Sequence, residues 1–144
     1  MGLAQVFDIS AAGMDVQQLR LQVAASNIAN ARTTSAPGTA PYQPLTVVVR
    51  ASAPSAGAAG EAVLAGGLAR PYGQIVPLSA APKRVYEPGN PDADKDGFIS
   101  VPGVDPIGSM MDLLEISRSY EANLRAFDIT RSLMQRTLDI GNRS

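Results

Sequence analysis

Residues 9–30 read Ile9-Ser-Ala-Ala-Gly-Met-Asp-Val-Gln-Gln-Leu-Arg-Leu-Gln-Val-Ala-Ala-Ser-Asn-Ile-Ala-Asn30. Their less polar positions recur at alternating steps of three and four residues, the heptad pattern of a helix that buries one stripe. At about 1.5 Å per residue the predicted helix is roughly 33 Å long, which is marginal without a partner. The stripe consists of Ile9, Ala12, Val16, Leu19 and Val23 and turns polar at its last two positions, Ser26 and Asn30.

A second and longer helix is predicted from Pro106 to Gly141. Asp105 is expected to cap its first turn, and proline suits the first helical position; Ser109 with Asp112 offers an alternative capping box. A long terminal helix with one apolar stripe is typical of a coiled coil or the edge of a bundle. Subunit packing is expected for Ile9, Val16, Leu19, Val23 and Ile28 in the first helix and for Leu113, Ile116, Tyr120, Leu124, Phe127, Met134 and Leu138 in the second.

The segment between the helices reads as short strands and loops. Residues 51–70 are dominated by Ala, Gly, Ser and Pro, which predicts a flexible loop. The fold class is therefore mainly α with a small β-rich middle, and its long N- and C-terminal helices are expected to pair as a coiled coil. Strands are expected at Leu45–Arg50, Gln74–Leu78, Lys83–Glu87 and Phe98–Val101. The expected parts are 1–34 (N-terminal helix), 35–104 (middle region) and 105–144 (C-terminal helix).

Composition argues against several classes of function. The chain has 144 residues, with 12 Lys+Arg against 13 Asp+Glu, and its sequence has no basic patch. Nucleic-acid binding is therefore not expected. It has no Cys and no His, which removes thiol nucleophiles and the commonest general acid–base group; we expect neither an enzyme nor a cofactor. No stretch has the roughly 18 apolar residues needed to span a bilayer, and Asp8 and Asp15 argue against a cleavable signal peptide.

One motif imitates a calcium site. Asp92, Asp94, Asp96 and Gly97 match the front half of an EF-hand loop, but position twelve, where a bidentate carboxylate is needed, is Gly103. Prolines on both sides also replace the flanking helices. We therefore favour a polar turn between two strands over a metal site at these aspartates. A small calcium-binding helical module remains an alternative function.

Three segments resemble the flagellar axial proteins, the family of rod, hook and hook-associated subunits. Ile9–Thr34, with Ala-Ser-Asn-Ile-Ala-Asn at its core, resembles the N-terminal signature of the whole family. Val85–Val104 is similar to a segment of the proximal rod subgroup, and Met111–Asn123 resembles its C-terminal helix signature. Asn90 and Gly103 depart from the pattern, where His and Asn are usual. The matching residues include Asn27, Asn30, Tyr86, Pro88, Gly89, Pro91, Asp92, Asp94, Gly97, Tyr120, Glu121 and Asn123.

The resemblance implies a structural subunit of the bacterial flagellar basal-body rod that transmits motor torque. It implies export without a cleaved signal peptide through the flagellar type III apparatus, and assembly in the periplasm on the membrane-ring side of the basal body. The implied partners are copies of the chain itself and other rod proteins. In this family the terminal segments tend to be disordered in the free subunit and to form paired helices on assembly. The alternative within the family is a different rod or hook component.

Overall fold

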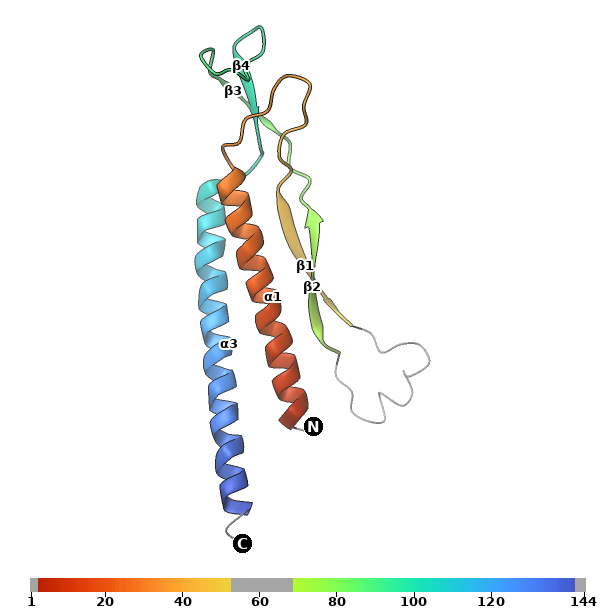
Figure 1. Cartoon of the computed structure of the whole chain (residues 1–144), viewed down its shortest axis with the longest axis vertical. Helices are drawn as coiled ribbons and strands as arrows, with labels where there is room; N and C mark the ends of the chain where they lie inside the picture. Colours follow the sequence, from red (N-terminus) through yellow and green to blue (C-terminus); the bar gives the residue numbers. More distant parts are fainter. Residues whose placement is uncertain (1–2, 53–68, 142–144) are drawn as a thin grey trace, which may run out of the picture. The chain divides into compact units, whose positions relative to one another are not determined.

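A computed structural model describes residues 3–52 and 69–141 of the chain (Figure 1). It confirms two long terminal helices with short strands between them. Most of the loop expected at 51–70 lies outside the described residues. The elements in chain order are α1 (Leu3–Asn30), β1 (Leu45–Ala51), β2 (Pro71–Pro77), β3 (Lys83–Tyr86), β4 (Phe98–Val101) and α3 (Pro106–Gly141).

Helix α1 begins at Leu3, ahead of the predicted start, and ends at Asn30 as predicted. The polar residue at its end has a partner in the helix itself: Asn30 Nδ2 donates a hydrogen bond to the Ser26 carbonyl at 2.8 Å. The backbone N–H of Thr33 then donates to the Asn30 carbonyl at 3.1 Å, closing a turn. Prolines 37, 41 and 44 lack the N–H that a continuing helix needs.

Helix α3 has the predicted cap. Asp105 Oδ1 accepts a hydrogen bond from the backbone N–H of Ile107 at 3.1 Å, which satisfies one of the free donors of the first turn. The helix begins at Pro106, so the alternative capping box at Ser109 and Asp112 is wrong. A proline at the first helical position loses no helical hydrogen bond, which is why the cap of Asp105 prevails.

The strands form two separate two-stranded sheets, β1–β2 and β3–β4. At the two ends of β1–β2, the Ser52 N–H donates to Arg70 and the Leu78 N–H donates to Pro44, which sets an antiparallel register. In β3–β4 the antiparallel register pairs Tyr86 with Phe98. All four predicted strands are confirmed, although β2 begins at Pro71, earlier than expected. Two-stranded sheets are marginal alone and depend on what they contact.

The chain divides into two compact units, each with a small core. One unit draws its described residues from Met1–Leu19, Val49–Gln74 and Ile116–Ser144, and its most buried side chains include Val16 and Ile116. The other comprises Arg20–Val48 and Ile75–Glu115. Its buried side chains are Val23, Ala24, Ala31, Pro44, Ile99, Pro102 and Val104. The buried side chains of both units are few and none is aromatic, so each unit buries little apolar surface.

Candidate assembly surfaces

On α1, the predicted packing residues lie on the less exposed side of the helix. Val16 and Val23 are buried, whereas Ile9, Leu19 and Ile28 are half-buried. The heptad spacing therefore identifies the side of α1 that faces protein. Whether this side also contacts another subunit stays a prediction.

On α3, the predicted stripe is covered only in its first half. Ile116 is buried, and Leu113, Tyr120 and Phe127 are half-buried. Leu124 is 41% exposed, while its neighbour Asn123 is half-buried. Steps of three or four residues lead from Tyr120 to Phe127 through either position, and the structure turns the asparagine inward. The matching residue Glu121 is exposed.

The two helices meet through an aromatic pair in the first unit. The ring centroids of Phe7 and Phe127 are 4.9 Å apart with an interplanar angle of 81°. This edge-to-face geometry is favoured by aromatic rings and adds to the apolar area that they bury. Phe7 lies outside the predicted stripe because, at about 100° per residue, it is nearly half a turn around α1 from Ile9.

The end of α3 is open to solvent along its whole circumference. Every residue from 131 to 140 is exposed. Met134 and Leu138, both predicted packing residues, are 36% and 58% exposed, so α3 carries apolar side chains that the described residues leave uncovered. Neither described helix contains a segment of the length and apolarity needed to cross a membrane. Such exposed apolar surface is typical of protein–protein contact sites.

The end of α1 is tied to the start of β1 by the side chain of Asn27. Its Nδ2 donates to the Leu45 carbonyl at 2.7 Å, and its Oδ1 accepts from the Leu45 N–H at 2.9 Å. The Tyr42 hydroxyl donates to the same Oδ1 at 3.0 Å. The amide thus imitates a neighbouring strand for the first residue of β1. The sequence marked Asn27 only as a signature residue; nothing local pointed to a partner 18 positions away.

We expect Asn27→Asp to destabilise the second unit by about 1–3 kcal/mol, the cost of leaving a part-buried polar group without its hydrogen bond. The aspartate keeps the acceptor but sets a carboxylate oxygen against the Leu45 carbonyl. Urea denaturation followed by the NMR signals of Tyr42 and Leu45 measures the effect. Gln22→Glu makes the same amide-to-acid change on the exposed side of α1. An equal loss in both variants would contradict a specific role for the hydrogen bonds of Asn27.

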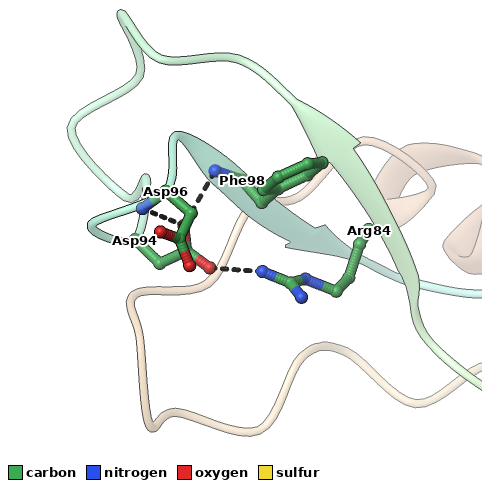
Figure 2. A network of polar contacts seen from close by, with 4 residues as sticks. All are labelled: Arg84, Asp94, Asp96 and Phe98. Atoms are coloured by element: carbon green, nitrogen blue, oxygen red, sulfur yellow. Dashed lines mark hydrogen bonds and ion pairs between the residues drawn. The ribbon is translucent and has the colours of Figure 1, made fainter.

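The aspartate-rich segment forms the loop of the β3–β4 hairpin, and Asp94 organises it (Figure 2). Its Oδ1 accepts hydrogen bonds from the backbone N–H groups of Asp96 and Phe98, both at 2.9 Å. Its Oδ2 lies 2.6 Å from Arg84 Nη2. The Phe98 hydrogen bond is the largest cause that holds the pKa of Asp94 below its ordinary value; desolvation opposes it, and the Asp96 hydrogen bond and the Arg84 guanidinium lower the pKa further.

Asp92 of the same loop has a different partner. The Thr34 hydroxyl donates to Asp92, which ties the connection after α1 to the hairpin, and a bridge between Ser35 and Ser100 reinforces this tie. Within residues 3–52 and 69–141, no three acidic side chains are grouped so that they could hold a metal ion. A hollow of about 340 Å³ beside the loop is lined by Arg84, Asp94 and Phe98 among others, with the Arg84–Asp94 ion pair in its wall.

Asp94→Ala is expected to loosen the hairpin more than Asp94→Asn, because an asparagine still accepts from both backbone N–H groups. Since the folded pKa of Asp94 is depressed, its carboxylate contributes stability above the ordinary pKa of 3.8, and this is lost as pH falls through the folded value. The stability difference between the wild-type chain and Asp94→Asn should therefore shrink below about pH 4. Amide exchange in β3–β4 measures it; a difference that grows on acidification would contradict this role.

Comparison with known proteins places these surfaces in a family. Residues 95–140 match the family described as "Flagellar basal body rod FlgEFG protein C-terminal". This range covers the end of the Asp94 loop, β4 and nearly all of α3. The exposed end of α3 is therefore part of the region that the family shares.

Relatives from several bacteria match nearly the whole chain. The flagellar basal-body rod protein FlgC of Salmonella typhimurium is 38% identical over 141 residues, covering 98% of this chain and 99% of the relative. FlgC of Aquifex aeolicus is 33% identical over 145 residues (96% and 97%). FlgC of Bacillus subtilis is 31% identical over 142 residues (93% and 95%).

Proposed function

Because this chain belongs to the FlgC family of flagellar basal-body rod proteins, it is a structural subunit of the rod, and we propose that its terminal helices carry motor torque from subunit to subunit. In this proposal α1 and α3 pair as a coiled coil that is completed only when neighbouring subunits cover it. The observation that carries the proposal is the exposed end of α3, residues 131–140.

The physical support is a mismatch between apolar surface and core. Leu138 and Met134 continue the side of α3 that bears Phe127, yet both are exposed. Burying an aliphatic side chain stabilises an assembly by about 1.5–3 kcal/mol. A subunit with such a surface gains stability from each neighbour that covers it. Load can then pass through many buried contacts without any single strong one.

The parts of the chain have different proposed roles. Segments 1–34 and 105–144 form the helical layer of the rod, and the middle region 35–104 projects from it. The side chain of Asn27 joins these parts, since two hydrogen bonds link the end of α1 to Leu45 of β1 and a third links it to Tyr42 of the connection, so force can pass between helix and strand.

The partners follow from the same proposal. They are copies of the chain and other rod proteins, with the flagellar type III apparatus acting during export and the periplasm as the place of assembly. We propose no catalysis, because the sequence lacks His and Cys. A different axial component is not favoured, given that the relatives above are named FlgC. The calcium alternative is not favoured either, because Asp94 already binds two backbone N–H groups and Arg84.

Amide exchange tests the proposal by comparing free chain with assembled rods. We expect residues 9–30 and 107–140 to exchange rapidly in dilute monomer and slowly in isolated basal bodies, with the largest change over 131–140. The β3–β4 hairpin, tied by its own hydrogen bonds, should change least and is the internal control. Strong protection of both helices in dilute monomer would contradict a coiled coil that depends on neighbours.

A further inference from the structure

Helix α3 carries a second apolar row on the side away from Phe127. Ile129, Leu133 and Ile140 are 62%, 57% and 72% exposed. At about 100° per residue they lie between a third and nearly half of a turn around the helix from Phe127. Because Phe127 faces Phe7 of the chain's own α1, this second row cannot meet the same helix. Its occupant must come from elsewhere.

Arginines run along the same side as the second row. Arg118, Arg125 and Arg136 are all exposed and lie within about a fifth of a turn of Ile129 by the same rotation per residue. Arg125 lies 3.8 Å from Glu121 in a solvent-exposed pair that holds it only weakly. We call the set Arg118, Arg125, Ile129, Leu133, Arg136 and Ile140 the arginine row. An occupant of this row needs acidic groups and small side chains that allow close approach.

Helix α1 has a row with that chemistry. Asp8, Ala11, Asp15 and Gln18 follow one another at steps of three, four and three residues, and all are exposed. We call this set the acidic row. Asp8 also pairs with Arg70, but both side chains are more than half exposed, so this ion pair contributes little and can exchange.

The charges of the two rows have matching spacing. Asp8 and Asp15 are seven residues apart, as are Arg118 and Arg125, so each pair spans about 10.5 Å along its helix. Two helices packed side by side can therefore form both ion pairs at once. The equal spacing permits either direction, with Asp15 opposite Arg118 in one and opposite Arg125 in the other.

We propose that the arginine row of α3 packs against the acidic row of α1 from a second copy of this chain. The inference rests on the proposed function and adds to it a specific contact between like subunits. One face of α3 meets the chain's own α1 through Phe127, and the opposite face meets a neighbour's α1. Each α3 then lies between two α1 helices, which continues the helical layer from copy to copy.

Cysteine cross-linking tests this contact directly, because the chain has no cysteine of its own. Asp15→Cys is produced in the source bacterium together with Arg118→Cys or Arg125→Cys, each on a separate chain. Isolated basal bodies are treated with a short bismaleimide. A covalent dimer of this chain is expected in one of the two mixtures, several-fold above the mixture of Asp15→Cys with Asp128→Cys. Asp128 is exposed on α3 but lies outside the arginine row.

The possible outcomes distinguish a failure of this contact from a failure of the proposed rod function. Wild-type chain present in basal bodies, with no dimer in either mixture, would overturn the contact and leave the rod function standing. Cross-linking of Arg118→Cys or Arg125→Cys to a different rod protein would also overturn it. Absence of the wild-type chain from basal bodies would overturn both. As a further test, Asp15→Arg and an aspartate at the arginine that cross-links (Arg118→Asp or Arg125→Asp) should each reduce swimming several-fold, and the double variant should restore it. A double variant that swims no better than either single variant would contradict the contact.

Discussion

Cells that carry Leu19→Asp or Phe127→Asp in place of the wild-type chain are expected to make and export the subunit but to build no rod. Leu19 is half-buried on the protein-facing side of α1, and Phe127 packs against Phe7. Truncating a buried Leu or Phe costs about 2–5 kcal/mol, and a carboxylate adds the cost of burying a charge. The defect recurs in every copy, so the loss of assembly exceeds that of a single contact. Fractionation of cells and imaging of isolated basal bodies measure the result.

Matched controls separate burial from charge. Gln22→Asp and Ala126→Asp add the same carboxylate to α1 and α3 at exposed positions outside the predicted stripe and, on α3, outside residues 131–140. We expect both to assemble. Normal rods with Leu19→Asp and Phe127→Asp combined would refute the paired helices. Failure of the two controls together with the stripe variants would show that any added negative charge blocks the rod.

Gly97→Val is expected to open the β3–β4 hairpin. Gly97 has φ +80°, a conformation that costs an ordinary residue about 1–2 kcal/mol and a β-branched one more. A Cβ at this position would also lie 2.9 Å from Cε2 of Tyr86 and 3.1 Å from Cβ of Pro88. The Tyr86 ring packs on Phe98 with centroids 5.3 Å apart, so displacing it removes a second contact. Amide exchange at Arg84 and Ser100 should rise towards that of an open loop.

Substitutions at two other glycines separate the backbone strain from the steric clash. Gly38→Ala tests the backbone strain alone, because Gly38 has φ +86° and open space where its Cβ would lie. Gly89→Ala in the same hairpin loop tests neither, since its Cβ would also meet open space. The expected order of destabilisation is Gly97→Ala, then Gly38→Ala, then Gly89→Ala. Equal effects at Gly97 and Gly89 would rule out the steric explanation.

Local patterns predicted the elements well because their causes are local. The step of three and four residues located both helices, and the aspartate before Pro106 fixed the start of α3. The run of β-branched residues located β1. The expected polar turn around Asp94 is a real hairpin loop, since its aspartate and glycine supply the turn geometry within a few residues.

Features that depend on distant partners were not predictable. Asn123 and Leu124 both fit the helical spacing, and only the rotation of α3 against its partner decides which is inward. The strand-like amide of Asn27 requires Leu45, and the Arg84–Asp94 ion pair requires the register of the hairpin. Which side of α3 meets the chain's own α1, and which apolar row is therefore left over, follows only from the Phe7–Phe127 contact.

The most direct test of the account is a map of the isolated basal body that resolves side chains. We predict continuous density for α1 and α3 in one helical layer, with Leu19 and Phe127 enclosed and the end of α3, residues 131–140, covered by neighbouring subunits. Helices of this chain that are unpaired in the rod, or an α3 end that faces solvent in every copy, would contradict the claim that assembly completes this fold.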